Sequence, residues 1–159
     1  MAPPLSSSAQ KVQSALREAG FSGDIIELPQ STRSAAEAAK AVGCAVGQIV
    51  KSIVFRATQT DRPILVVASG ANRVNERAIG DLIGEPLAKA DAEFVRARTG
   101  FSIGGVPPIG HTEPIETFVD EDLFGFAEIW AAAGTPHAVF RLTPTALVRL
   151  TRGRVVKIA

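Results

Sequence analysis

Two segments in the first half of the chain are almost continuously apolar. They run from Ile49 to Phe55 and from Ile64 to Ala68, and the polar stretch Thr58-Gln59-Thr60-Asp61-Arg62-Pro63 joins them. Short apolar runs bounded by turn residues are typical of strands that are covered on both faces. The sequence therefore predicts two neighbouring buried strands, paired antiparallel.

Elsewhere the apolar residues recur at helical spacing, and most of the predicted helices begin or end at a capping residue. The predicted helices run from about Ser8 to Ala19, from Ser34 to Gly43, onward from Asn75, from Ala92 to Arg98, and onward from Thr143-Pro144. The expected N-terminal caps are Ser34 (with Glu37), Asn75, Asp91 and Thr143, and the expected C-terminal stops are Gly20, Gly43 and Gly100. The expected inner faces are Ala9, Val12, Leu16 and Ala19; Ala35, Ala38, Ala39 and Val42; and Ala78, Ile79, Leu82 and Ile83.

Further strands are shorter and less regular. They are predicted over Asp24–Leu28, Ala127–Ala131, His137–Leu142 and, as an edge strand, Val155–Ile158. Gly104 to Pro114 is too rich in glycine and proline for either regular state. No repeat, low-complexity tract or linker divides the chain. We therefore expect one mixed α/β domain over residues 1–159, not a regular βαβ array, with a flexible segment over residues 1–7.

Composition narrows the class of protein. With 46% hydrophobic and 21% charged residues, the chain has the composition of a soluble globular domain. No apolar run is long enough to span a bilayer, and the N-terminus lacks the pattern of a secretory signal. The single cysteine, Cys44, excludes an internal disulfide, and we expect a cytoplasmic protein. His111 and His137 are far apart in sequence, so neither a metal nor a cofactor is expected.

Charge argues against a protein that coats nucleic acid, because the net charge is only +1. A net charge of +1 is still compatible with a protein that contacts a single RNA end. Basic residues gather locally, and for each group the ordinary interpretation is a solvated helix face. The groups are Arg73 and Arg77; Arg96 and Arg98; and Arg149, Arg152, Arg154 and Lys157.

Lys51 is the most unusual residue of the predicted strands. Side chains alternate along a strand, so Lys51 shares one face with Ile49, Ile53 and Phe55. An unpaired buried ammonium costs several kcal/mol, so it needs a carboxylate, a cleft or a path to water. The pattern leaves two interpretations open: a lysine that reaches solvent along the strand, or a lysine that projects into a ligand pocket.

The segment Gly100 to His111 is the second unusual feature. Gly104 and Gly105 allow close backbone approach or positive φ, and Pro107 and Pro108 then stiffen the path. Free N–H groups in such a loop can hold an oxygen of a ligand. An ordinary rigid turn explains the composition equally well, and no Walker or Rossmann glycine pattern is present.

The ordered set of these features resembles the YbaK/ProX family, the editing domain that is also inserted in bacterial prolyl-tRNA synthetases. The resemblance covers nearly the whole chain. It is carried by Ser31-Thr32, Val50–Phe55, Ile64–Ser69, Thr99-Gly100-Phe101, Gly104–His111, Val119–Leu123 and Ala131–Gly134. It implies an α/β fold with a mixed, mostly antiparallel, barrel-like sheet surrounded by helices.

The implied activity is a trans-acting aminoacyl-tRNA deacylase, which hydrolyses the ester between a wrong small amino acid and tRNA, chiefly proline tRNA. A synthetase pocket cannot strongly reject residues of equal or smaller size, so a second hydrolytic site discards them. Lys51 matches the essential family lysine, and we expect it to position the substrate and stabilise negative charge. The expected substrate-binding residues are Thr32, Ser52, Phe55, Ser69, Gly70, Gly104, Gly105, Val106, Pro107, His111 and Ala132.

Rival candidates for chemistry are weaker. His111 lies in the loop, where a polar structural histidine is the commoner case, and Cys44 would need an electropositive setting to be reactive. Asp120, Glu121 and Asp122 lack calcium-loop spacing, so we expect them to cap a short helix, or one of them to pair with Lys51. No protein nucleophile is evident, so water or a substrate thiol would attack the ester.

Several alternatives stay open at this point. The chain is also compatible with a non-catalytic module that binds tRNA ends or a synthetase, or with a regulator that binds a nucleotide or an amino acid. Ser52 follows the lysine where some cysteine-directed relatives carry threonine, so cysteine, alanine and serine or threonine all remain candidates for the edited residue. The expected partners are the aminoacylated 3′ end of tRNA and prolyl-tRNA synthetase. We expect a monomer or a weak homodimer, with no membrane contact.

Overall fold

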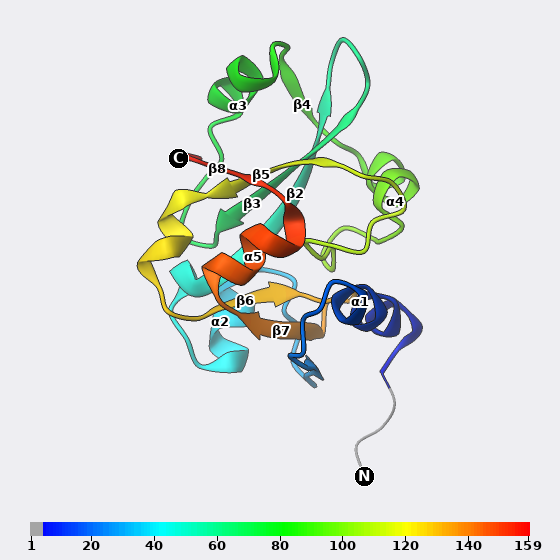
Figure 1. Cartoon of the computed structure of the whole chain (residues 1–159), viewed down its shortest axis with the longest axis vertical. Coiled ribbons are helices and arrows are strands. Elements are labelled where there is room, and N and C mark those ends of the chain that lie inside the picture. The colour runs from blue at the N-terminus through cyan, green and yellow to red at the C-terminus, as the bar shows by residue number, and fades with distance from the viewer. Residues whose placement is uncertain (1–4) are drawn as a thin grey trace.

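The computed structural model describes residues 5–159 and shows a single mixed sheet with helices on both faces (Figure 1). The helices are α1 (Ser7–Glu18), α2 (Ala35–Val42), α3 (Glu76–Ile83), α4 (Ala92–Thr99) and α5 (Pro144–Thr151), with short 3-10 turns at η1 (Val46–Gln48) and η2 (Glu121–Gly125). The strands are β1 (Ile25–Glu27), β2 (Ile49–Ala57), β3 (Pro63–Ser69), β4 (Leu87–Lys89), β5 (Glu116–Asp120), β6 (Ile129–Ala132), β7 (Ala138–Leu142) and β8 (Arg154–Val156).

The strands lie in the order β1-β7-β6-β2-β3-β5-β8, and β4 pairs separately with β2. The β2–β3, β2–β4, β6–β7 and β1–β7 pairs are antiparallel, whereas β2–β6, β3–β5 and β5–β8 are parallel. The predicted mixed, mostly antiparallel sheet is thus confirmed. Its expected barrel-like closure is not found, because β1 and β8 lie at opposite ends of the sheet.

The two faces of the β2–β3 hairpin are covered by different helices, which explains why both strands are mostly apolar. Val50 and Val54 of β2 and Leu65 of β3 belong to the cluster that includes Leu147 of α5. Phe55 and Ile64 point the other way and pack with Ile79 of α3. The prediction of two central, doubly covered antiparallel strands is therefore confirmed.

Capping residues set the helix ends as predicted. The side chains of Ser34, Asn75, Asp91 and Thr143 each accept a hydrogen bond from a backbone N–H in the first turn. Gly43 and Gly100 end their helices in the left-handed conformation, with φ of 75° and 83°. Two inner-face predictions are wrong: Leu82 is 41% exposed, and Ala19 is an exposed C-cap residue outside α1. Both lie near helix ends, where the apolar stripe of a short helix is poorly defined.

Two strands were missed by the sequence pattern. β4 has three residues, too few to show a periodicity, and β5 carries acids at both ends, Glu116 and Asp120. The segment predicted as flexible, residues 1–7, lies mostly outside the described residues. Within it, Ser6 caps α1, which begins at Ser7. None of the helices in residues 5–159 has the length and apolar character needed to cross a membrane.

The tip of the β2–β3 hairpin is held by the carboxylate of Glu85, whose side chain is 6% exposed. Its Oε1 accepts hydrogen bonds from the N–H groups of Gln59 and Thr60, both at 2.9 Å, and Arg62 Nε lies 3.8 Å from Oε2. The bond from the Thr60 N–H is the main reason why the pKa of Glu85 lies below its usual value. The carboxylate thus joins the hairpin tip to the start of β4.

Replacement of Glu85 by glutamine is expected to lower the urea midpoint at neutral pH, because an amide accepts these bonds less strongly than a carboxylate. A lowered folded-state pKa gives stability that is complete above the unfolded pKa of about 4.3 and is lost as pH falls through the folded pKa. Urea unfolding of the wild type and the variant between pH 7 and pH 3 measures both effects.

Glu18→Gln is the matched control, because Glu18 is exposed near the end of α1 and no hydrogen bond or ion pair of its side chain is found within residues 5–159. Its midpoint should follow the wild type at every pH. A Glu85→Gln protein with wild-type pH dependence would show that this clasp does not contribute to stability.

Candidate functional site

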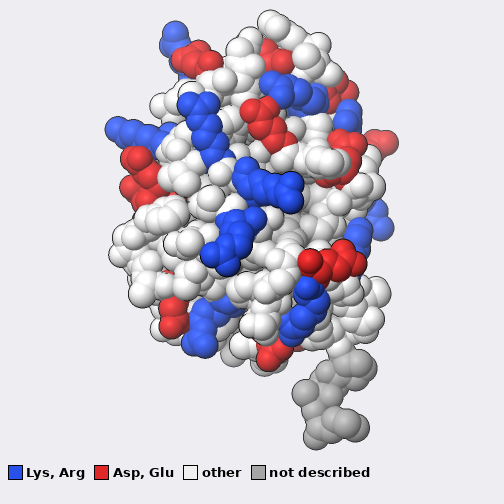
Figure 2. Space-filling model, viewed as in Figure 1, with Lys and Arg blue, Asp and Glu red and all other residues white. Residues whose placement is uncertain are grey.

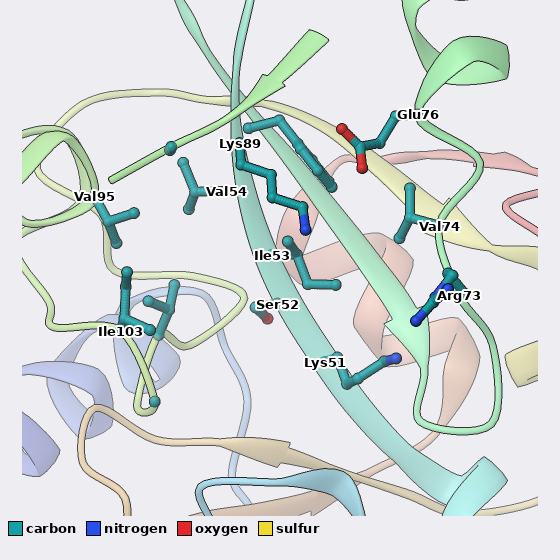
Figure 3. Close-up of a pocket in the computed structure, with 14 residues that line it drawn as sticks. Lys51, Ser52, Ile53, Val54, Arg73, Val74, Glu76, Lys89, Val95 and Ile103 are labelled. Carbon is teal, nitrogen blue, oxygen red and sulfur yellow. The ribbon is translucent and has the colours of Figure 1, made fainter. Parts of the chain in front are cut away.

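A cavity of about 580 Å³ lies against the middle of β2 (Figure 3). This volume is in the range of small-molecule sites. The walls come from β2, from the loop between β3 and α3, from the end of β4, from α4 and from the glycine-proline loop. The lining residues are Lys51, Ser52, Ile53, Val54, Phe55, Arg73, Val74, Glu76, Lys89, Ala90, Val95, Ile103, Gly104 and Val106.

The cavity extends around the edge of β2 and so touches both faces of the strand. Figure 3 shows Lys51 and Ile53 on the side of Arg73 and Val74, and Ser52 on the side of Ile103. This is possible because β6 pairs only with the first two residues of β2 and β4 only with the last three. The segment from Lys51 to Val54 therefore has β3 as its one neighbouring strand within residues 5–159.

Lys51 projects into this cavity and is held by the main chain. Its Nζ donates to the carbonyl oxygen of Asn72 at 2.6 Å, and the residue is half-buried. Burial lowers the pKa of the Lys51 ammonium, the Asp120 carboxylate opposes this effect, and the positive charge of Arg73 adds to it. Of the two interpretations that the sequence left open, the geometry therefore favours the lysine in a pocket.

Asp120 organises the turn on which Lys51 rests. Its side chain is fully buried, and Oδ2 accepts from the N–H of Ser69 at 2.9 Å and from Nδ2 of Asn72 at 2.8 Å. Its Oδ1 accepts from the N–H of Asp122 at 2.9 Å and so caps η2, as predicted for this acidic run. The expected direct pairing with Lys51 is not present as an ion pair. The link runs through the Asn72 carbonyl instead.

The glycine-proline loop forms the opposite wall. Gly104 has φ of 98° and lies against the side chain of Arg33. A Cβ at Gly105 would come within 2.8 Å of the Thr135 backbone, and the Gly105 carbonyl accepts from the N–H of Gly134 at 2.9 Å. The first glycine therefore provides a left-handed turn and the second a close approach to the chain that joins β6 and β7.

Positive charge dominates the lining of the cavity, where Lys51, Arg73 and Lys89 stand against a single acid, Glu76. Arg73 and Lys89 are exposed at its rim. In the face that Figure 2 shows, basic and acidic side chains are intermingled, as the net charge of +1 suggests. The positive character of the cavity lining is therefore not shared by this face as a whole.

Five of the predicted site residues line the cavity together, namely Lys51, Ser52, Phe55, Gly104 and Val106. Three others make hydrogen bonds to main-chain carbonyls outside the lining. Ser69 Oγ donates to the Gly47 carbonyl, the Gly70 N–H donates to the Ile49 carbonyl, and Thr32 Oγ1 donates to the Pro136 carbonyl. The predicted residues outside the lining are Thr32, Ser69, Gly70, Gly105, Pro107, His111 and Ala132.

The two rival side chains lie away from Lys51. His111 borders a different hollow, near the end of α5, and its Nε2 lies 2.7 Å from the Pro107 carbonyl. Burial lowers the pKa of His111, against the effect of that carbonyl. Burial raises the pKa of the Cys44 thiol, the opposite of what a reactive cysteine needs. Within residues 5–159 no group of three or more His, Cys, Asp or Glu side chains is close enough to hold a metal ion.

Sequence reasoning missed several residues of the cavity, above all Lys89, Val95 and Ile103. Lys89 comes from the unpredicted strand β4. Arg73 is predicted only as a member of a basic group. The turn Ser69-Gly70-Ala71-Asn72, of which Ser69 and Gly70 are predicted binding residues, comes directly before Arg73 and provides the carbonyl that holds Lys51.

Comparison with known proteins identifies the family and agrees with the fold. Residues 29–150 match the sequence profile of the aminoacyl-tRNA editing domain. A crystal structure described as "a putative trans-editing enzyme for prolyl tRNA synthetase" is 50% identical, with a TM-score of 0.92 over 98% of both chains.

Two curated bacterial proteins are more distant. YwhH of Bacillus subtilis (strain 168), which is uncharacterised, is 29% identical over 83% of this chain and 83% of its own. The "Putative Cys-tRNA(Pro)/Cys-tRNA(Cys) deacylase EbsC" of Enterococcus faecalis (strain ATCC 700802 / V583) is 29% identical over 79% of this chain and 76% of its own.

Asp120→Asn is expected to destabilise the protein by about 1–3 kcal/mol. The N–H₂ group of asparagine replaces one carboxylate oxygen and cannot accept the hydrogen bonds that this oxygen accepts. The turn that holds Lys51 should loosen as well. Urea unfolding measures the first effect, and amide hydrogen exchange at residues 69–72 measures the second.

Asp81→Asn is the control. The substitution removes the same charge, and Asp81 is exposed on α3. It should change neither stability nor exchange. Unchanged exchange in the Asp120→Asn protein would mean that this carboxylate does not hold the turn.

Proposed function

The chain belongs to the aminoacyl-tRNA editing domain family, and on this premise we propose that it is a trans-acting aminoacyl-tRNA deacylase. The reaction adds water to the ester carbonyl, breaks the bond between that carbon and the ribose oxygen, and returns a proton to the ribose. The observation that carries the proposal is the half-buried ammonium of Lys51, fixed by the Asn72 carbonyl inside a cavity of substrate size.

The role proposed for Lys51 follows from its surroundings. A fixed positive charge beside the ester stabilises the negative charge that develops on the carbonyl oxygen in the tetrahedral intermediate. Such an ammonium needs no reorganisation as the reaction proceeds, since Asn72 already holds it. Lys51 thus acts as a charge stabiliser and a positioning group.

Water is the proposed nucleophile. Among the lining residues only Ser52 carries a hydroxyl, and its Oγ has no hydrogen-bond partner within the described residues that could serve as its base. An aminoacyl ester is already activated, so positioning and charge stabilisation supply much of the required rate. A substrate thiol remains the alternative nucleophile when the amino acid is cysteine.

The proposed substrate is proline tRNA that carries a small wrong amino acid: cysteine, alanine, or serine or threonine. The names of two relatives support the link to proline tRNA and its synthetase. The apolar walls from Val54, Val95 and Val106 suit a small side chain. Arg73 and Lys89 at the rim would face the phosphates of the tRNA end.

The second candidate is a binding module of the same fold that captures tRNA ends or a synthetase without hydrolysis. The positive rim alone would serve either function. A charged group held within the cavity, away from the rim, favours the hydrolase, because a binding module gains little from burying an ammonium.

The first test is a panel of proline tRNAs charged with alanine, cysteine, serine, threonine or proline. The wild type should release one or two of the small residues and spare proline. Lys51→Ala should lower kcat by about 10²–10³, because one fixed charge stabiliser is lost. Tight binding of the charged tRNA without any release would favour the binding module.

The second test is the pH dependence of kcat after subtraction of spontaneous hydrolysis. Because the pKa of Lys51 is lowered, activity should fall with rising pH below the usual lysine value of about 10.4. The ammonium is the active form, so the loss follows its deprotonation. Any activity left in Lys51→Arg should lack this alkaline fall, since arginine stays charged. An identical alkaline fall in both proteins would assign it to another group.

A further inference from the structure

The gap in the sheet beside β2 exposes main-chain hydrogen-bonding groups to the cavity. The β6 pairing ends at Val50, and the β4 pairing starts at Phe55. In an antiparallel pair, alternate residues direct both their N–H and their C=O toward the same neighbour. Two of the four residues between these pairings therefore turn their peptide groups away from β3.

Hydrogen bonds at both ends of β2 identify the two residues that turn their peptide groups away from β3. The N–H of Gly70 donates to the Ile49 carbonyl at 2.7 Å, and the N–H of Ala57 donates to the Arg62 carbonyl at 2.9 Å, so odd-numbered residues face β3. On the other edge the N–H of Thr58 donates to the Pro86 carbonyl at 2.9 Å, so even-numbered residues face β4 and β6. Ser52 and Val54 thus direct their peptide groups toward this edge. Val54 adjoins the β4 pairing, so Ser52 is the residue whose peptide groups face the gap.

Ser52 has three polar groups without a protein partner in the described residues. Its N–H and C=O point away from β3, beyond the last residue that β6 pairs with. Its Oγ is buried and makes no hydrogen bond. Buried polar groups in folded proteins are nearly always satisfied, so such a set on one cavity-lining residue calls for a ligand or for water.

We propose that the main-chain edge at Ser52 binds the aminoacyl group of the substrate, an inference that rests on the proposed deacylase function. An aminoacyl ester has a nitrogen and a carbonyl on either side of one α-carbon, as does a residue of a neighbouring strand. It fits the place that a strand residue would take opposite Ser52. The Ser52 C=O accepts from the α-ammonium, and the Ser52 N–H donates to the ester carbonyl.

The proposed contacts at Ser52 select for a free α-amino group and not for a particular side chain. The contacts at Ser52 are common to all amino acids, so selection by side chain is left to the apolar walls. An acylated α-nitrogen has lost its charge and carries a bulky group where the Ser52 carbonyl accepts. The site would therefore take aminoacyl-tRNA and reject peptidyl-tRNA and other N-blocked forms.

The test compares a free and an N-acetylated substrate. The amino acid released in the panel is loaded on proline tRNA, and half of the preparation is acetylated on the α-nitrogen. The free form should be hydrolysed with a kcat/KM at least about tenfold higher, as expected for a lost hydrogen bond to a charged group. Equal values would overturn the role of Ser52 while leaving the deacylase function intact.

A binding arm separates this proposal from the proposed function. The probes are 3′-alanylamino-3′-deoxyadenosine, whose amide resists hydrolysis, and its N-acetyl derivative, and calorimetry gives their Kd values. A preference of about tenfold or more for the free amine supports the Ser52 edge even if no tRNA is hydrolysed. Equal binding of both probes contradicts it.

Two variants separate the main chain from the hydroxyl. Ser52→Ala keeps the peptide groups and should keep the preference for the free amine; loss of that preference would assign recognition to Oγ. Replacement of Ser52 by its α-hydroxy acid removes the N–H, which the β-ladder does not use, and makes the Lys51 carbonyl an ester carbonyl, which accepts more weakly from β3. This protein should melt somewhat below the wild-type Tm and bind the alanyl probe about tenfold more weakly. Unchanged affinity would contradict the donor role of this N–H.

Discussion

The buried carboxylate of Asp120 is the interaction on which the site depends. A fully buried charge is tolerated only when hydrogen bonds compensate it, and three N–H groups do so here. Two of these donors come from the end of β3 and the turn after it, and one comes from η2. The carboxylate therefore joins the end of β5 to the Ser69–Asn72 turn, and the turn presents the Asn72 carbonyl to Lys51. The buried carboxylate of Asp120 thus positions the ammonium of Lys51 through Asn72, without direct contact between the two charges.

An interrupted sheet makes room for the site. A nine-residue strand such as β2 would normally pair along its length on both sides. Here the neighbours β6 and β4 each cover one end, and the cavity takes the place between them. The lost ladder hydrogen bonds are a local cost, which the covered faces of the hairpin offset through apolar burial. The result is a rigid strand with free hydrogen-bonding groups, held ready before any ligand arrives.

The sequence predicted the elements better than their pairing. Strong apolar runs and capping residues carry local information, so β2, β3 and the helix ends followed from single residues such as Ser34 and Gly100. The gap beside Ser52 depends on where β6 stops and β4 starts, which are long-range facts without a local pattern. Lys51 was recognisable because a charge is rare in an apolar strand. Its partner, the Asn72 carbonyl, is main chain and so leaves no trace in residue identity.

The low net charge of the chain is consistent with this architecture. Affinity for nucleic acid rises with the number of phosphates neutralised, and a protein that scans RNA by charge needs many basic groups. A site that acts on one ester at the end of a strand needs only a few, placed near that ester. Arg73 and Lys89 lie at the rim and Lys51 lies within, so basic groups follow the path from the rim to the position proposed for the ester. Because so few cations face the cavity, contacts to the aminoacyl group must supply much of the binding energy, and main-chain groups at the free edge of β2 are the ones in position to make them.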